Sequence, residues 1–297
     1  MDRRADPTEH LPNSYVSRRS TEAQAFSVWR EPTGVLRELT DEAAARAATL
    51  RASTDALRRQ AASVPAQPGF AAALKRDDVA VIAEVKRSSP SKGVINAGID
   101  IGAQVVDYTR GGAAAVSILT EGTRFGGSND DLLKARKATP LPLLKKDFHV
   151  DVVQILEAKA LGASAALLIV RAVNPETLRQ LIDVAKDISL ETLVEIRTEQ
   201  ELDLALSCGA TIIGVNNRNL ETLEIDPENS LRLIPMIPKD VVAIGESGVK
   251  SADDVRRLGE AGADAVLVGS EVSAARDPAT AVRSLTGIPR GGGARKG

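Results

Sequence analysis

Lysines and carboxylates stand at the ends of apolar runs in this sequence, where they could transfer protons. Glu84 and Lys86 close the run VAVIAEVK, and the run LPLLKKD ends in Lys145, Lys146 and Asp147. Residues two apart on a regular strand share a face, so Glu84 and Lys86 are expected to point the same way. A lysine half-buried near other cations loses proton affinity and can act as a general acid or, when neutral, as a nucleophile. Alternation along the strand does not decide which lysine of the second run faces inward.

Two later runs also end in polar side chains. Glu195 stands in ETLVEI, and IIGVNNRNL brings three polar residues to the end of its run, namely Asn216, Asn217 and Arg218. Polar groups at strand ends commonly satisfy loop backbone, so each of these residues taken alone is only a candidate.

The last two runs lead into loops rich in glycine and serine. The segments GESG (245–248) and VGSEV (268–272) put Gly248, Gly269 and Ser270 where backbone N–H groups can bind a phosphate. Glycine needed only for tight turns is the simpler explanation of one such loop, and both loops together favour the phosphate site. No dinucleotide fingerprint precedes a helix. These residues predict a phosphorylated small-molecule substrate handled by lysine and carboxylates, with no metal and no cofactor.

Composition excludes several other classes of protein. The 297 residues carry 38 Lys+Arg against 40 Asp+Glu, a net charge of -2, and only 2% are aromatic, which argues against nucleic acid and membranes as partners. The longest apolar stretches are shorter than the roughly 18 residues of a spanning helix. A single cysteine, Cys208, and an N-terminus without an apolar signal region predict a cytoplasmic protein.

The elements that must position these residues are short apolar runs that alternate with amphipathic helical segments. Runs buried on both faces are typical of a parallel sheet covered by helices, and eight such units favour one closed (βα)8 barrel of the α/β class over a doubly wound open sheet. The runs cover residues 79–86, 114–120, 141–147, 165–170, 191–196, 211–216, 241–247 and 265–269.

The flanking segments have a different composition. Residues 1–33 are polar and interrupted by proline, which predicts a flexible N-terminal extension. Residues 34–64 predict helix with a break near Ser53 and Thr54, and PGFAAALKRDD predicts a further helical turn. We expect one barrel domain over 34–287 that includes these helices, and a disordered tail over 288–297.

Seven segments identify a resemblance that covers roughly residues 66–287. IAEVKRSSPSKGVI, SILTEGTRFGGS, LLKKDF, LVEI, IIGVNNRNL, IGESGV and VLVGS occur in the order and spacing of the indole-3-glycerol-phosphate synthase family, the ring-closing enzymes of tryptophan biosynthesis. The resemblance implies a carboxy-lyase that converts 1-(2-carboxyphenylamino)-1-deoxy-D-ribulose 5-phosphate to indole-3-glycerol phosphate, with loss of carbon dioxide and water and without a cofactor. It also implies that the N-terminal helices cover the barrel.

The resemblance further implies roles for individual residues. Lys146 looks like the general acid that protonates the ketone, and Glu195 like the second proton-transfer residue, supported by Glu84 and Asn216. Lys86 would hold anionic substrate groups and help tune Lys146. The pocket lining would include Ser89, Arg218, Glu246 and Ser247, with Phe125 against the anthranilate ring and with Gly248, Gly269 and Ser270 on the phosphate.

One residue near the motifs departs from the family pattern, and other functions remain open. His149 stands where an apolar residue is usual, and it could affect the proton affinity of the neighbouring lysines. A Schiff-base aldolase using Lys146, a phosphosugar isomerase and a catalytically silent phosphate binder are the alternatives. The expected assembly is a monomer or a weak homo-oligomer.

Overall fold

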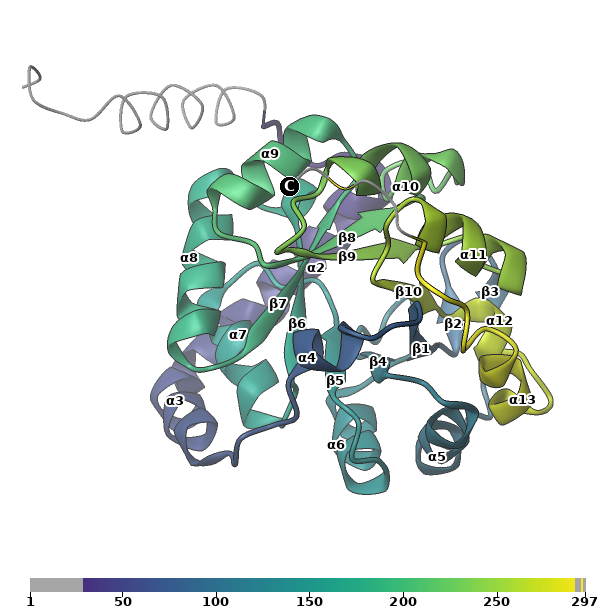
Figure 1. Cartoon of the computed structure of the whole chain (residues 1–297). Coiled ribbons are helices and arrows are strands. Elements are labelled where there is room, and N and C mark those ends of the chain that lie inside the picture. Colours follow the sequence, from purple (N-terminus) through teal and green to yellow (C-terminus); the bar gives the residue numbers. More distant parts are fainter. Residues whose placement is uncertain (1–28, 292–294, 296–297) are drawn as a thin grey trace, which may run out of the picture.

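A closed barrel of eight parallel strands forms the centre of the computed structural model, which describes residues 29–291 and Arg295 (Figure 1). Around the barrel the strands follow the order β1, β10, β9, β8, β7, β6, β5 and β4, after which β4 pairs with β1. Their bounds are β1 Ala80–Val85, β4 Ala115–Leu119, β5 Leu143–Lys146, β6 Ala165–Ile169, β7 Glu191–Ile196, β8 Ile212–Asn216, β9 Val242–Glu246 and β10 Ala265–Val268. Each predicted run contains one strand, so the (βα)8 prediction is confirmed and the open sheet is wrong.

Helices follow the strands and cover the outside of the barrel (Figure 1). They are α5 Ile101–Gly111, α6 Asn129–Ala138, α7 Val152–Ala160, α8 Pro175–Asp187, α9 Glu199–Ser207, α10 Glu228–Leu233, α11 Ala252–Glu260, α12 Ser270–Ser273 and α13 Pro278–Arg283, with the 3-10 turns η2 Val170–Ala172 and η3 Ile234–Met236. Between β1 and α5 the chain forms a small antiparallel hairpin of β2 Ser88–Ser89 and β3 Gly93–Val94. Within the described ranges, no helix combines the length and apolar character needed to cross a bilayer.

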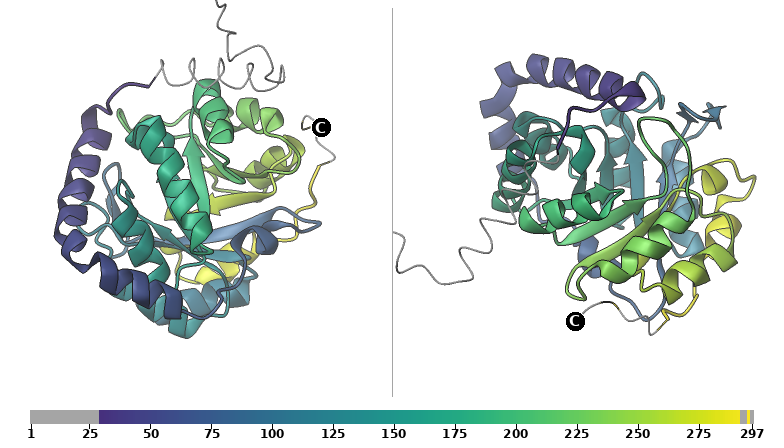
Figure 2. Two further views of the ribbon diagram at one scale, coloured as in Figure 1. Left: turned by 90° about the vertical axis from the view of Figure 1, so that its left-hand side faces the viewer. Right: turned by 90° about the horizontal axis from the view of Figure 1, so that it is seen from above.

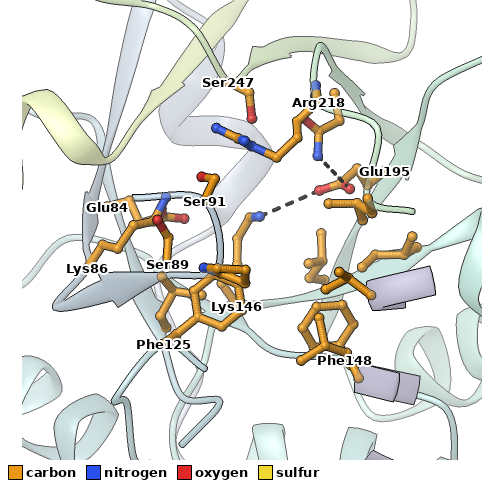
Figure 3. A pocket seen from close by; sticks show the side chains of 18 of the residues that line it. Glu84, Lys86, Ser89, Ser91, Phe125, Lys146, Phe148, Glu195, Arg218 and Ser247 are labelled. Carbon is orange, nitrogen blue, oxygen red and sulfur yellow. Dashed lines mark hydrogen bonds and ion pairs between the residues drawn. The ribbon is translucent and has the colours of Figure 1, made fainter. Parts of the chain in front are cut away.

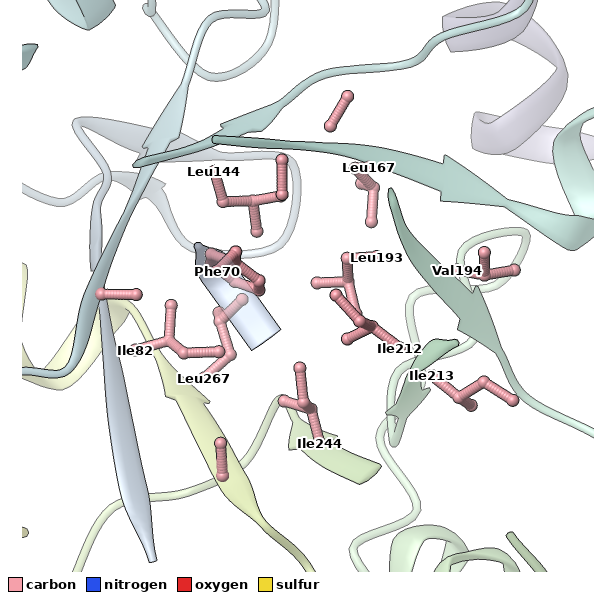
Figure 4. Close-up of a cluster of buried hydrophobic side chains, with 14 of the residues drawn as sticks. Phe70, Ile82, Leu144, Leu167, Leu193, Val194, Ile212, Ile213, Ile244 and Leu267 are labelled. Atoms are coloured by element: carbon pink, nitrogen blue, oxygen red, sulfur yellow. The ribbon is translucent and has the colours of Figure 1, made fainter. Parts of the chain in front are cut away.

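The interior of the barrel is layered, because side chains alternate along each strand. A lower layer is apolar (Figure 4) and consists of Ile82, Leu144, Leu167, Leu193, Ile212, Ile244 and Leu267. Four of these residues are followed, two positions later on the same strand, by a charged residue. The pairs are Ile82 and Glu84, Leu144 and Lys146, Leu193 and Glu195, and Ile244 and Glu246. The period of two therefore places these charges directly above the apolar layer, at the carboxyl ends of the strands.

The helix α4 (Phe70–Leu74) closes the opposite end of the barrel. Phe70 is fully buried and points among the lower-layer side chains (Figure 4). The carboxylate of Glu191, the first residue of β7, accepts hydrogen bonds from the backbone N–H groups of Phe70 and Ala71 at the start of α4. A carboxylate at a helix N-terminus is favourable, so this contact fixes the plug at the amino ends of the strands.

The N-terminal helices run along the outside of the barrel and reach its carboxyl end (Figure 2). The helix α2 (Gly34–Leu50) passes through the turn η1 (Arg51–Ser53) into α3 (Thr54–Ser63), so the predicted break is confirmed. Three arginine–carboxylate contacts attach α2 and η1 to the barrel loops, namely Arg46–Asp147 at 2.7 Å, Arg51–Asp151 at 2.7 Å and Arg124–Glu38 at 2.5 Å.

The structure describes a part of each of the two terminal segments. Residues 1–28 of the predicted flexible extension are outside the described residues, whereas Thr33 donates two hydrogen bonds to Glu221, at 2.8 and 2.9 Å. Of the segment predicted as a disordered tail, residues 288–291 and Arg295 are described. Ile288 accepts a hydrogen bond from Val79, and Arg295 forms a buried ion pair with Asp264 at 2.9 Å. At these positions, unlike in the prediction, the chain is held against the barrel.

Candidate active site

Lys146 is the lysine of the KKD segment that faces the barrel interior. It follows Leu144 by two residues and lies on the same face of β5. Lys145 points to the opposite side, where its Nζ lies 3.3 Å from Asp147 Oδ2 and 3.4 Å from Glu157 Oε2. The structure thus decides the question that alternation along the sequence left open. Lys145 belongs to the packing between strand and helix, and Lys146 belongs to the site.

Three carboxylates surround the Lys146 ammonium. Its Nζ lies 3.5 Å from Glu195 Oε2 and 3.5 Å from Glu246 Oε2 (Figure 3 shows the first contact). Burial lowers the pKa of Lys146, but the charges of Glu195, Glu246 and Glu84 outweigh burial and raise the pKa above its usual value. The sequence pattern suggested a lysine weakened by cations, whereas the structure shows one held protonated by carboxylates. A protonated amine can donate a proton and is a poor nucleophile.

Glu84 and Lys86 form a close ion pair beside Lys146. Lys86 Nζ lies 2.7 Å from Glu84 Oε1, and Ser117 Oγ donates to Glu84 Oε2 at 3.3 Å. Burial raises the pKa of Glu84, but the positive charges of Lys86 and Lys146 more than offset burial, so the net shift is downward. The predicted common face of Glu84 and Lys86 is thereby confirmed.

Asn216 orients Glu195 through a hydrogen bond. Asn216 Nδ2 donates to Glu195 Oε1 at 2.8 Å, and Asn216 Oδ1 accepts from the backbone N–H of Arg218 at 2.9 Å. One oxygen of Glu195 therefore contacts Asn216 while the other contacts Lys146. A carboxylate held at both oxygens has a defined direction for proton transfer.

Glu246 is a buried carboxyl of the site whose pKa is raised. It is 1% exposed, and its Oε1 has no hydrogen-bond partner in the described part of the chain. Burial raises the pKa of Glu246, and the charges of Glu195 and Glu84 raise it further against the opposing effect of Lys146. Gly214 on β8 makes room for this carboxyl, because a Cβ there would lie 1.9 Å from Glu246 Oε1.

A pocket opens above this cluster, and we call it the aryl pocket (Figure 3). The rings of Phe125 and Phe148 lie 6.4 Å apart, and Val35 and Leu39 of α2 contribute further apolar surface. The aryl pocket is lined by Val35, Leu39, Glu84, Lys86, Ser89, Pro90, Ser91, Leu119, Phe125, Lys146, Asp147, Phe148, Leu167, Ile169, Glu195, Asn216, Arg218, Leu220, Leu223, Ser247 and Ser270. Apolar walls beside a charged floor suit a planar ring that carries anionic groups.

A second pocket adjoins the first, and we call it the glycine pocket. Ser247 and Gly248 both have positive φ, 65° and 87°, so the chain turns sharply after β9. On the other side, Gly269 leaves space for the ion pair, since a Cβ there would lie 2.5 Å from Glu84 Oε1. The cations lining the glycine pocket are Lys86, Lys92, Lys146, Arg218 and Lys250. Their charge and the backbone N–H groups of the two turns suit a phosphate.

The predicted site residues come together in these two pockets. Ten of them line the aryl pocket, and the remaining three, Glu246, Gly248 and Gly269, line the glycine pocket. Sequence reasoning missed Phe148, Ser117 and Gly214. The aromatic residue that directly follows the KKD strand end could have indicated Phe148, whereas the contacts of the other two follow only from the closure of the barrel.

His149 lies behind the cluster, away from Lys146. Its Nδ1 is 2.7 Å from the carbonyl oxygen of Leu167 and its ring is 2% exposed. Burial, followed by the charge of Lys145, lowers the pKa of His149 to about 3, so the ring is neutral at physiological pH. Among the residues described, no group of three or more His, Cys, Asp or Glu side chains is arranged to hold a metal ion.

The fold and the site together define a (βα)8-barrel enzyme whose lysines and carboxylates meet at the carboxyl ends of the strands. Residues 36–285 match the family model described as indole-3-glycerol phosphate synthase, and the chain belongs to that family. It is similar to the indole-3-glycerol phosphate synthase of Streptomyces griseus subsp. griseus, with 47% identity over 79% of this chain and 87% of that protein. It is also similar to indole-3-glycerol phosphate synthase 2 of Streptomyces coelicolor, with 46% identity over 86% of this chain and the whole of that protein.

Among solved structures, the chain resembles 3-hexulose-6-phosphate synthase from Salmonella typhimurium. The TM-score is 0.54 with 17% sequence identity, and the match covers 70% of this chain and 96% of that one. At this identity the likeness shows the barrel fold alone.

Proposed function

We propose that the protein closes the indole ring in tryptophan biosynthesis. It converts 1-(2-carboxyphenylamino)-1-deoxy-D-ribulose 5-phosphate to indole-3-glycerol phosphate, with release of carbon dioxide and water. The observation that carries this proposal, in a chain of this family, is the Lys146 ammonium held between Glu195 and Glu246 at the floor of the aryl pocket. The reaction needs an acid at that place, and the surrounding carboxylates keep Lys146 protonated.

Lys146 acts as the general acid in the first step. The ring carbon that bears the carboxylate attacks the ketone carbon of the sugar chain, and Lys146 protonates the ketone oxygen as the new carbon–carbon bond forms. A positioned acid of this kind contributes about 10²–10⁴ in rate. Loss of carbon dioxide from the same ring carbon then restores the aromatic ring.

Glu195 acts in the dehydration that follows. The new hydroxyl leaves as water, and the neighbouring CH₂ group loses a proton to form the double bond of the indole. Glu195 transfers a proton in this step in the orientation that Asn216 gives it, 2.8 Å away. Glu84 supports the proton transfers indirectly, because its negative charge is one of those that keep Lys146 protonated.

The two pockets accommodate the two ends of the substrate. Phe125 and Phe148 contact the anthranilate ring, and Lys86 attracts the anionic groups. The phosphate binds in the glycine pocket to the backbone of three residues, Gly248, Gly269 and Ser270. The remaining lining is supplied by Ser89, Arg218, Glu246 and Ser247.

An assay of indole fluorescence tests the proposal. The purified protein, with no metal added, should form indole-3-glycerol phosphate from the carboxyphenylamino-deoxyribulose phosphate. Absence of turnover by the folded protein contradicts the proposal and favours the alternative of a catalytically silent phosphate binder. Borohydride treatment in the presence of substrate should trap no covalent adduct, because a protonated Lys146 does not form a Schiff base. A trapped adduct would favour the aldolase.

The biological setting is part of the same proposal. We expect a cytoplasmic enzyme that acts on a phosphorylated small molecule, with residues 34–287 as one barrel domain. We also expect a monomer or a weak homo-oligomer, which size-exclusion chromatography with light scattering measures directly.

A further inference from the structure

The buried hydroxyl of Ser273 lies at the junction between the glycine pocket and the Glu84–Lys86 ion pair. Ser273 ends α12, the short helix that begins at Ser270 beside Gly269, and its backbone N–H donates to the carbonyl of Gly269 at 2.9 Å. The side chain of Ser273 is 0% exposed, and Ser273 is not among the residues that line either pocket. Ser273 therefore does not contact substrate in the proposed binding mode.

The hydroxyl of Ser273 holds the chain on both sides of Val85, where β1 ends. Ser273 Oγ donates to the backbone carbonyl of Glu84 at 2.8 Å and accepts from the backbone N–H of Lys86 at 3.0 Å. Since β1 ends at Val85, the N–H of Lys86 lies beyond the barrel ladder. The Ser273 hydroxyl thus replaces the next hydrogen bond of the barrel ladder. It fixes the backbone of Lys86, whose side chain carries the ammonium group.

Tyr108 of α5 completes this buried network. Its hydroxyl also donates to the carbonyl of Glu84, at 3.1 Å, lies 3.2 Å from Ser273 Oγ, and accepts from Gln104 Nε2 at 3.0 Å. The carbonyl of Glu84 therefore has two donors, whereas Tyr108 makes no hydrogen bond to Lys86. This difference separates the two hydroxyls although they share one network.

The same helix is attached to the loop that follows β1. Asn96 Nδ2 donates to the backbone carbonyl of Ser273 at 3.4 Å, and Lys92 Nζ lies 3.5 Å from Glu271 Oε1. Gly269, at the other end of this turn, allows Glu84 Oε1 and Lys86 Nζ to approach within 2.5 and 3.1 Å of where a Cβ would stand. The turn that forms one wall of the glycine pocket is thus in contact with the ion pair at both of its ends.

We propose that Ser273 is a positioning residue that holds the Glu84–Lys86 pair in register with the glycine pocket. Through it, the turn at Gly269 and Ser270 sets where the Lys86 ammonium lies relative to Lys146. This inference rests on the proposed function, in which Lys86 attracts the anionic groups of the substrate while the phosphate occupies the glycine pocket. Misplacement of a catalytic group by about 1 Å can cost a factor of about 10².

Ser273→Ala and Tyr108→Phe form a matched pair that tests the inference. Each variant removes one hydroxyl from the same buried network, but only Ser273→Ala leaves the N–H of Lys86 without its partner. We expect kcat of Ser273→Ala to fall about tenfold, because the Lys86 ammonium shifts relative to Lys146. KM should change less than threefold, because the backbone that binds the phosphate remains in place. Tyr108→Phe should stay within twofold of the wild type in both constants. Ser273→Cys, which keeps the shape with a weaker donor, should fall between them.

The outcomes are distinguishable from failure of the proposed function. Wild-type turnover of the carboxyphenylamino-deoxyribulose phosphate is measured first, and its absence overturns the proposed function. With an active wild type, equal losses of kcat in Ser273→Ala and Tyr108→Phe overturn only the positioning role. If Ser273→Ala does not fold, Ser273→Cys is the test instead. A kcat of Ser273→Cys equal to that of the wild type overturns the inference.

Discussion

Replacing Gly214 by alanine should displace the buried carboxyl of Glu246. The new Cβ would lie 1.9 Å from Glu246 Oε1, whereas an ordinary contact begins at 3.4 Å, so the carboxyl must move by about 1.5 Å. Glu246 Oε2 is one of the two carboxylate oxygens that lie 3.5 Å from Lys146 Nζ. A displacement of this size at the reacting groups should lower kcat/KM about a hundredfold, which corresponds to ~2.7 kcal/mol of transition-state stabilisation.

Gly245→Ala provides the matched control in the neighbouring strand. Its Cβ would meet Leu258 Cδ1 at 3.0 Å, on the side of β9 that faces helix α11 and away from the pockets. Both variants add one methyl group to a crowded strand, so both should lower the unfolding temperature. Only Gly214→Ala should lose turnover in the indole fluorescence assay. If Gly214→Ala keeps more than about a third of the wild-type kcat/KM, the position of Glu246 does not matter for catalysis and the reasoning is refuted.

Three further predictions concern charges around the site and at the ends of the chain. Because the pKa of Glu246 is raised in the folded state, the wild type should lose stability as pH rises above 4.5. Thermal melts of Glu246→Gln should show a smaller loss of stability between pH 5.5 and 7.5. The same dependence of Tm on pH in the two proteins would contradict the raised pKa. Glu221→Gln weakens the anchor of Thr33 at the start of α2 and should raise KM roughly fivefold with little change in kcat, and an unchanged KM would show that α2 stays in place without it. Arg295→Ala removes one buried partner of Asp264 and should lower Tm by roughly 5 °C at unchanged kcat, so an unaltered melting curve would mean that this contact adds nothing.

The barrel could be predicted from sequence because its signal repeats. Strands buried on both faces are apolar throughout, and each of the eight runs stood apart from the helices that follow it. A Gly-Ala pair also follows four of the helices, and each of these glycines has the left-handed conformation that ends a helix, at Gly112, Gly162, Gly209 and Gly262.

The direction of single side chains could not be predicted in the same way. Lys145 and Lys146 are adjacent and chemically identical, so only the register of β5 in the closed barrel distinguishes the packed lysine from the site lysine. The raised pKa of Lys146 depends on carboxylates from three other strands, β1, β7 and β9. Those distances are properties of the closed barrel and are absent from any local pattern.

The terminal segments differ from expectation for a physical reason. The glycine-rich basic composition of the tail predicts disorder. Asp264 of the barrel, however, is a buried carboxylate that needs partners, and arginines of the tail supply them. Arg290 and Arg295 both pair with it, and the backbone N–H of Ala243 donates to it at 2.8 Å. The sequence of the tail alone cannot predict this contact, because the acceptor Asp264 is distant along the chain.

The central claim is that Lys146, and not its neighbour, supplies the proton. Lys146→Arg and Lys145→Arg both keep the positive charge beside their carboxylate partners, but an arginine does not release a proton at neutral pH. In the indole fluorescence assay, kcat of Lys146→Arg should fall at least about a hundredfold, while Lys145→Arg should stay within about threefold of the wild type. Equal activity of the two variants, or a greater loss in Lys145→Arg, would contradict the account.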